Sequence, residues 1–349
     1  MALVRRSIAI DLGTASVLVY SKQKGIILEE PSVIAVDFLS KKILSVGESA
    51  KKLLGRTPGS IVAIRPMKDG VIADFKATEE MLKYFIEKSI DKALLKPDVL
   101  ICIPSKATQV EKRAVLQASE NAGSHRTYLI EEPLAAAIGA GVDTSDPGGN
   151  MVIDVGGGTT DVAVISMGQI VVSESIDIAG DCFDRAIINY VRERYGLLIG
   201  ETSAEKIKIQ ANNLELNDSI EIKGRDIEEG LPVQKYMPME ELQEALIPSI
   251  DKVCDVVIKV LSETPPELAA DLYDRGIIMT GGASMTRFLR ERINDKIQVE
   301  AYIADDPIRC VVKGTGKALE WLRKLDEETM ESIKEKQIEL AYKEGLRRR

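Results

Sequence analysis

The hydrophobic and polar positions follow the same pattern in two stretches of the chain. In each stretch an apolar run ends in an aspartate, a glycine turn and a threonine, at residues 11–14 and again at residues 154–160. A second apolar run follows each turn at once, and a third run follows after Gly25 and after Gly168. Short apolar runs separated by glycine predict strands joined by turns. The pattern therefore predicts a three-strand meander that occurs twice.

Helical patterns follow each meander. Thr108 and Glu111 match the capping box, which predicts a helix that ends near Gly123. Apolar residues at helical spacing after Asp181 predict another helix, closed by Gly196. Strand meanders followed by helices, twice over, predict an α/β fold of two similar halves with a cleft between them. Further helices are expected at residues 78–92, 203–214, 242–262, 286–292 and 305–325, and irregular chain at residues 224–238.

Two segments interrupt this plan and are expected to form small subdomains. The first, at about residues 25–75, is rich in strand patterns and contains three prolines. The second, at about residues 200–247, begins with a helical pattern. We expect a first domain at residues 1–145, with its small subdomain at about 32–75. A second domain is expected at residues 146–330, with its small subdomain at about 200–247, followed by a charged C-terminal tail at 331–349.

Composition narrows the classes of function. Hydrophobic residues make up 45% of the 349 positions and charged residues 29%, which is typical of a folded protein. The net charge of −9 argues against a nonspecific nucleic-acid binder, whose affinity depends on Lys and Arg at phosphates. A single histidine and the absence of a C-x-x-C pair disfavour a zinc site. No segment matches a signal peptide or the ~20 apolar residues of a membrane span, so we expect a cytoplasmic protein with reduced thiols.

The two glycine turns are the candidate site of chemistry. Glycine lets consecutive backbone N–H groups converge on an anion, and Thr14 and Thr159 each add a hydroxyl. Two such turns facing each other would clamp the phosphates of one nucleotide, with Asp11 and Asp154 beside a hydrated Mg²⁺. A single turn of this kind can also be an ordinary tight hairpin, and the duplication is what favours phosphate binding. A strand rather than a helix follows each turn, which disfavours a Rossmann site, and the Walker motif is absent.

These motifs resemble those of the actin, sugar kinase and 70-kDa chaperone ATPase superfamily. Within it, the chain resembles the MreB family of bacterial actins over nearly its whole length. The resemblance implies an actin-like ATPase fold, in which two ribonuclease-H-like domains, each with a small subdomain, bind ATP or ADP with Mg²⁺ in the central cleft. It is carried by residues 11–15, 129–141, 151–165, 198–208 and 281–283, of which 129–141 is the most specific to MreB.

The resemblance also implies a role for individual residues. Asp11 and Asp154 would hold Mg²⁺ through water, and Asp181 matches an acid at the edge of the cleft. The first phosphate turn would be Gly13, Thr14 and Ala15, and the second Gly156, Gly157, Gly158 and Thr159. Glu205 and Lys208 match the contacts on the base and ribose side, while Gly281, Gly282, Ala283 and Met285 would line the adenosine side.

The catalytic carboxylate is either Glu131 or Glu132. Pro133 suits the first turn of a helix, so both acids lie at a helix N-terminus, where negative charge is favoured. Without the resemblance, both would be ordinary acids of a first helical turn. With it, Glu132 is the residue that positions the attacking water, and Thr159 is its partner. Phosphoryl transfer needs an in-line water and charge neutralisation more than a strong base.

Three single positions and one turn depart from the usual MreB pattern. Ser16, Asp161 and Ala179 replace the usual Asn, Glu and Gly, and residues 283–285 replace a Gly-Ala-Leu type of turn. We expect these changes to affect nucleotide affinity and turnover more than the fold.

The resemblance implies a cytoskeletal protein at the inner face of the cell membrane. Subunits would stack head to tail into filaments, with paired protofilaments. Leu94 and Leu95 match a loop that inserts into lipid in this family, although they also fit the apolar stripe of the preceding helix. The basic residues Arg347, Arg348 and Arg349 would be attracted to anionic lipid, or form a solvated terminus. The expected function is slow ATP hydrolysis coupled to filaments for cell shape or motility.

Three other functions remain open at this point. A small-molecule kinase of the same superfamily would need an acceptor-activating aspartate in the cleft, where this chain has Glu132. A chaperone ATPase would need a peptide-binding domain, for which the chain as given leaves no room. A filament scaffold that binds nucleotide with negligible hydrolysis would share every binding motif.

Overall fold

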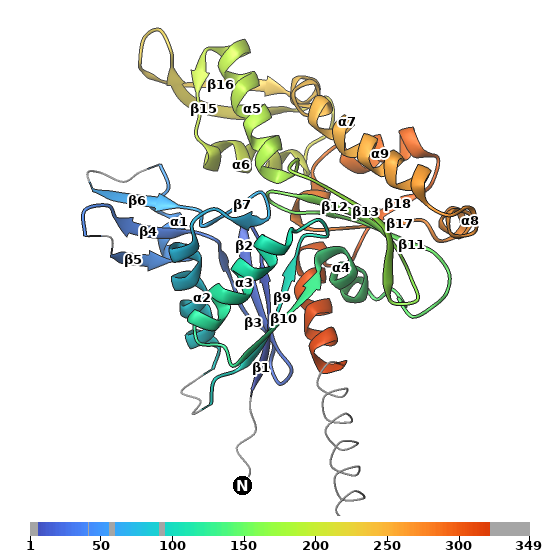
Figure 1. Cartoon of the computed structure of the whole chain (residues 1–349). Helices are drawn as coiled ribbons and strands as arrows, with labels where there is room; N and C mark the ends of the chain where they lie inside the picture. Colours follow the sequence, from blue (N-terminus) through green and yellow to red (C-terminus); the bar gives the residue numbers. More distant parts are fainter. Residues whose placement is uncertain (1–5, 41, 56–59, 91–94, 322–349) are drawn as a thin grey trace, which may run out of the picture.

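Two five-stranded sheets of the same topology form the framework of the protein. The computed structural model describes residues 6–40, 42–55, 60–90 and 95–321, and Figure 1 shows how its elements are arranged. In each sheet three consecutive strands form an antiparallel meander. A later strand pairs in parallel with the first strand of the meander, and a fifth strand pairs in parallel with that one. The first sheet has the order β10-β9-β1-β2-β3, from Arg126–Glu131, Asp98–Ile103, Ser7–Leu12, Ser16–Ser21 and Gly25–Pro31. The second has the order β13-β12-β11-β17-β18, from Gln169–Ile176, Thr160–Ser166, Asn150–Val155, Ile277–Thr280 and Ala301–Ile303. The duplication predicted from the sequence is therefore confirmed as a repeated topology.

The central strands are nearly continuous runs of apolar residues because helices cover both faces of each sheet. Every residue of β12 is buried, and β1 and β9 are almost as enclosed. The first half contains α2 (Phe75–Ser89), α3 (Gln109–Asn121) and α4 (Glu132–Ala140). The second contains α5 (Gly180–Tyr195), α6 (Glu201–Ala211), α7 (Met239–Glu263), α8 (Pro266–Arg275) and α9 (Leu289–Ile297).

Several helix ends follow the capping signals in the sequence. Both hydrogen bonds of the capping box at Thr108 are present, and Gly196 ends α5 in the left-handed conformation. Helix α2 begins three residues earlier than predicted, because the side chain of Asp74 accepts a hydrogen bond from the N–H of Ala77. Both α3 and α5 are confirmed within about two residues of the predicted ends.

Two predictions were wrong. Residues 224–238 were expected to be irregular, but β15 (Ser219–Asp226) and β16 (Pro232–Pro238) form an antiparallel hairpin beside β14 (Leu197–Leu198). Ile220, Ile222 and Met237 bury one face of this hairpin in the core. The many charged residues between them hid the alternating strand pattern in the sequence. The helix expected at residues 286–292 begins only at residue 289, as α9, and runs on to Ile297, because Phe288 takes a left-handed conformation; the 3₁₀ turn η1 (Gly282–Met285) precedes it.

The first small subdomain is built from short strands around one short helix. A three-stranded sheet has the order β5-β4-β6, and β7 pairs with β8 in a separate hairpin that turns at Asp69 and Gly70. The elements are β4 (Ile34–Asp37), β5 (Ile43–Val46), α1 (Glu48–Lys51), β6 (Ile61–Ile64), β7 (Met67–Lys68) and β8 (Val71–Ile72). The domain boundaries given above remain predictions.

The chain returns from the second half to the first after the 3₁₀ turn η2 (Pro307–Arg309). Residues 310–321 are helical, and Ala318 and Leu319 pack beside Ala9 and Leu100 of the first sheet (Figure 1, red helix). The sequence predicted this helix from residue 305; it begins at 310, and the expected end at 325 lies outside the described residues. This helix, the last one that the structure describes and hereafter the final helix, therefore contacts both halves.

The final helix and α4 approach each other through glycine. A Cβ atom on Gly314 would lie 1.7 Å from the carbonyl oxygen of Ala135, and one on Gly139 would lie 1.7 Å from that of Cys310. The side chain of Lys317 also donates a hydrogen bond to the carbonyl of Ile138, near the C-terminus of α4, at 3.0 Å. Only glycine permits this spacing between the two helices.

We expect Gly314→Ala to destabilise the fold by about 3 kcal/mol, because the added methyl group must push the final helix away from α4. Thermal unfolding should show a midpoint about 6 °C lower. Gly200→Ala is the control, since a Cβ there meets no atom within 4 Å. An unchanged midpoint for Gly314→Ala would contradict the described packing.

In the part of the chain that the structure describes, no helix combines the length and apolarity needed to cross a bilayer. Cys102, Cys182, Cys254 and Cys310 are all free, and all but Cys182 are buried.

Candidate functional site

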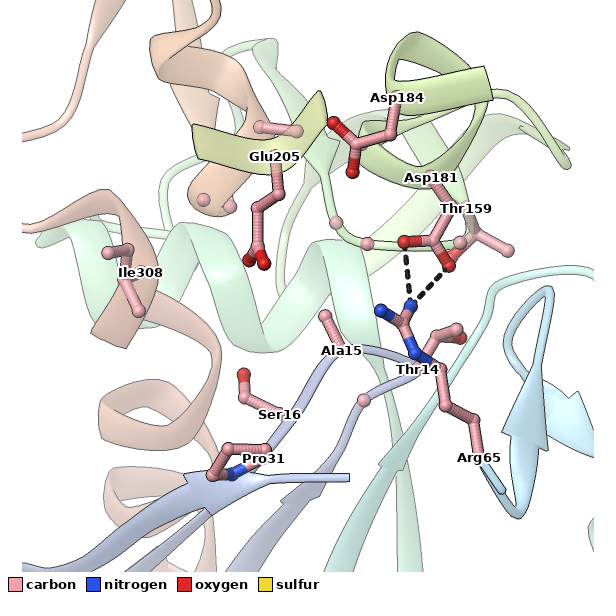
Figure 2. A pocket seen from close by; sticks show the side chains of 18 of the residues that line it. Thr14, Ala15, Ser16, Pro31, Arg65, Thr159, Asp181, Asp184, Glu205 and Ile308 are labelled. Carbon is pink, nitrogen blue, oxygen red and sulfur yellow. Dashed lines mark hydrogen bonds and ion pairs between the residues drawn. The ribbon is translucent and has the colours of Figure 1, made fainter. Parts of the chain in front are cut away.

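A cavity of about 600 Å³ lies between the two halves and receives residues from both sheets (Figure 2). Its walls include the ends of β1 and β11, the N-termini of α4 and α5, and part of α6. Every residue that the sequence assigned to the site lines this cavity: Asp11, Gly13, Thr14, Ala15, Glu132, Asp154, Gly156, Gly157, Gly158, Thr159, Asp181, Glu205, Lys208, Gly281, Gly282, Ala283 and Met285. Residues from six separate segments of the sequence are thus brought together, while their individual roles remain predictions.

The two glycine turns have the same backbone geometry. The N–H of Gly13 donates to the carbonyl of Ser16 at 3.1 Å, and the N–H of Gly156 donates to that of Thr159 at 2.9 Å. Each turn thus closes between the first two strands of its meander. The N–H of Asp181 also donates to the carbonyl of Gly157 at 2.8 Å, so the start of α5 holds the second turn.

The two turns also face each other closely. A Cβ atom on Gly157 would lie 2.5 Å from the Cβ of Ala15, and one on Gly158 would lie 2.7 Å from the hydroxyl of Thr14. The two hairpins can therefore approach this closely only with glycine in the second turn. As a result, backbone from both halves lines the same cavity.

The carboxylates of Asp11, Glu132 and Asp154 line the cavity, and that of Asp161 lies beside them. Burial raises the pKa of Asp11 to about 6 and that of Asp154 to about 7. Burial also raises the pKa of Glu132 well above its ordinary value, and the charges of Asp161, Asp11 and Asp154 raise it further. Asp161 lies directly opposite Asp154 on the neighbouring strand. The fold therefore concentrates negative charge where like charges repel one another and water is scarce.

These raised pKa values predict that stability depends on pH. Folded Asp11 and Asp154 bind protons more tightly than the unfolded chain does, so stability is greatest at low pH and falls as the pH rises toward about 7. Between pH 5 and pH 8 we expect a loss of about 4 kcal/mol without Mg²⁺ or nucleotide, seen as a falling thermal midpoint. Asp154→Asn should flatten this dependence, and a flat profile in the unmodified protein would contradict the acidic cluster.

The donor set fits a hydrated magnesium ion. Asp11 and Asp154 supply hard oxygen ligands from opposite halves, and a divalent cation would offset the repulsion that raises their pKa values. Among the described residues, no group of three His, Cys, Asp or Glu side chains is arranged to hold a metal. Two carboxylates that line one cavity suit an ion that keeps several of its waters, as Mg²⁺ does.

The outer part of the cavity is bridged by ion pairs between the halves. Arg65 donates to both carboxylate oxygens of Asp181, at 2.8 and 2.9 Å (Figure 2), and Lys51 lies 3.2 Å from the carboxylate of Glu205. Lys208 instead pairs at 2.8 Å with Asp184 of its own half. Glu205 and Lys208, predicted on the base and ribose side, and Asp181, predicted at the edge of the cleft, thus all have charged partners within the protein.

Sequence reasoning missed several residues beside the predicted site. Thr14 accepts a hydrogen bond from the N–H of Gly70 at 3.0 Å, and Asp161 accepts two from Ser105, both at 2.9 Å. An Asp-Gly pair is a strong hairpin signal that identifies the turn at Gly70 in retrospect. The Ser105 contact joins the two halves, and no local motif indicates it.

The chain matches one known protein family over nearly its whole length. Residues 5–327 match the family model described as MreB/Mbl protein. The chain belongs to the MreB/Mbl family. It is 51% identical to the cell shape-determining protein Mbl of Bacillus subtilis, over 92% of this chain and 97% of that protein. It is 47% identical to the cell shape-determining protein MreB of Escherichia coli K12, over 90% of this chain and 93% of that protein.

Solved structures support the same membership. MreB5 of Spiroplasma citri bound to ADP is similar with a TM-score of 0.88 and 37% identity, over 93% of this chain and 99% of that one. A second structure of that protein holds AMPPNP, again with a TM-score of 0.88. The MamK double helical filament, at 19% identity and a TM-score of 0.78, shares the fold. The actin-like fold expected from the sequence is confirmed for this MreB/Mbl family member.

Proposed function

We propose that this MreB/Mbl family member is an actin-like ATPase. It binds ATP with Mg²⁺ in the central cleft, polymerises head to tail into paired protofilaments, hydrolyses ATP slowly and acts in cell shape or motility. The observation that carries the proposal is the meeting of two duplicated Asp-Gly-Thr hairpins at one cavity. The relatives named cell shape-determining proteins, and MreB5 bound to ADP and to AMPPNP, support it.

The chain's own residues would divide the chemistry between them. The backbone N–H groups of the two turns would bind phosphate oxygens, and Glu132 with Thr159 would orient the attacking water. Asp11 and Asp154 would hold the waters of Mg²⁺, which supplies charge neutralisation at the phosphates. Gly281, Gly282, Ala283 and Met285 would contact the adenosine, and Lys208 and Glu205 the ribose and base.

A head-to-tail contact that does not close into a ring produces an open filament. Electron microscopy of the purified protein with ATP and Mg²⁺ therefore tests the proposal, with paired filaments as the expected result. Uniformly monomeric protein under the same conditions would contradict it. A small-molecule kinase is not favoured, and release of inorganic phosphate without any acceptor would separate the two functions.

We also propose that the protein attaches to anionic membranes. Leu95 is half-buried and follows α2, whereas Leu94 and the basic residues Arg347, Arg348 and Arg349 lie outside the described residues. In flotation with anionic vesicles, we expect the protein to rise with lipid and the double variant Leu94→Asp, Leu95→Asp to rise less. Equal recovery with and without vesicles would contradict membrane attachment.

A further inference from the structure

The duplication of the two halves continues one strand beyond the Asp-Gly-Thr hairpins. In the first sheet β9 lies parallel to β1, and in the second β17 lies parallel to β11. The register pairs Asp154 with Thr280. In the other half it pairs Ile10 with Ile101, so that Asp11 and Cys102 are the next residues along the same two strands. Cys102 and Thr280 therefore occupy equivalent positions beside the two aspartates.

Each of these neighbours donates a hydrogen bond to its aspartate. The thiol of Cys102 donates to Oδ1 of Asp11 at 3.2 Å, and the hydroxyl of Thr280 donates to Oδ1 of Asp154 at 2.7 Å. Both donors lie in the protein interior, with 3% and 0% of their surface exposed. Neither lines the cavity, whereas both aspartates do.

We propose that Cys102 and Thr280 are a matched pair of positioning residues, which orient the carboxylates of Asp11 and Asp154 for the hydrated Mg²⁺ of the nucleotide. The inference rests on the proposed function, because it concerns how this chain prepares the same site. A hydrogen bond to one carboxylate oxygen restricts rotation of the side chain before any ion is present. Donors behind the groups that hold a metal fix their orientation in this way.

The two halves should not contribute equally. A thiol is a weak donor and a hydroxyl a stronger one, so Asp154 is held more firmly than Asp11. Removing the donor at Thr280 should therefore cost more affinity for the Mg²⁺ complex than removing the donor at Cys102.

A purely structural role would give a different result. Cys102 packs against small residues of α4 and against Val152 and Val311, so both it and Thr280 also fill space in the core. If filling space were their only role, an apolar replacement of similar size would leave Mg²⁺ binding intact. Thr280→Val and Cys102→Ala remove the donors, while Thr280→Ser and Cys102→Ser retain a hydroxyl.

The test compares the affinity of each full-length variant for a fluorescent ATP analogue in Mg²⁺ and in EDTA. We expect Thr280→Val to reduce the gain in affinity from Mg²⁺ about tenfold, and Cys102→Ala about threefold. Since the two donors act on different aspartates, the double variant should lose about thirtyfold. The serine variants should stay near the unmodified protein, and affinities in EDTA should be equal throughout.

Thermal unfolding without ligand shows which variants are folded. If Thr280→Val does not fold, the comparison of Cys102→Ala with Cys102→Ser still tests the inference. The inference would be overturned if folded Thr280→Val and Cys102→Ala gained as much affinity from Mg²⁺ as the unmodified protein. It would also be overturned if the serine variants lost as much of that gain as the apolar variants. Failure of the unmodified protein to bind ATP at all would instead overturn the proposed function.

Discussion

Replacing Glu132 with glutamine should slow phosphate release from bound ATP by at least about a hundredfold without weakening ATP binding. Glu132 begins α4 and lines the cavity as a partly buried side chain, near enough to Asp11, Asp154 and Asp161 for their charges to act on it. Glutamine keeps the shape of the side chain but loses the charge that would orient an attacking water. An interaction made only in the transition state affects turnover and not ground-state affinity. Single-turnover phosphate release and equilibrium ATP binding measure the two quantities separately.

Glu131→Gln is the matched control, because the two acids are adjacent but differently placed. Glu131 is the N-cap residue of α4, its carboxylate lies 4.0 Å from Lys112, and 37% of its side chain is exposed. It does not line the cavity, so phosphate release from this variant should match the unmodified protein. Loss of release in Glu131→Gln with normal release in Glu132→Gln would reverse the assignment.

Valine in place of Gly158 should lower ATP affinity by at least about a hundredfold. A Cβ at this position would lie 2.7 Å from the hydroxyl of Thr14 and 3.0 Å from the backbone of Asp69. The second phosphate turn must then move away from the first half, and at least two charge-assisted hydrogen bonds to phosphate would be lost. Nucleotide titration measures the affinity, and the rise in thermal midpoint that ATP produces should disappear.

Gly200→Ala again provides the comparison, since it adds the same Cβ in open space at the start of α6. Its ATP affinity should remain within about twofold of the unmodified protein, because the change leaves the phosphate turns untouched. If Gly158→Val binds ATP normally, the phosphates do not lie between the two hairpins.

Much of the fold could be predicted because local and global signals agree. The two meanders are visible as apolar runs separated by glycine, and the caps at Thr108 and Gly196 place two helix ends within about two residues. The hairpin β15–β16 was missed because its exposed face is rich in charged residues. The late start of α9 was missed because phenylalanine at position 288 gives no sign of a left-handed conformation.

In the candidate site, too, some residues could be predicted from the sequence and others could not. The phosphate turns and their aspartates are contiguous in sequence, so a motif predicts them. Arg65, Lys51 and Ser105 come from the opposite half to their partners, and only the folded chain brings them into contact. Cys102 has no motif of its own, and its relation to Thr280 becomes visible only when the two sheets are compared.

A crystal structure of this chain with AMPPNP and Mg²⁺ would show whether one nucleotide binds between the two hairpins. We expect a triphosphate bound between residues 13–15 and 156–159, with waters of the metal facing Asp11 from one half and Asp154 from the other. A nucleotide bound elsewhere, or a metal remote from either aspartate, would contradict it.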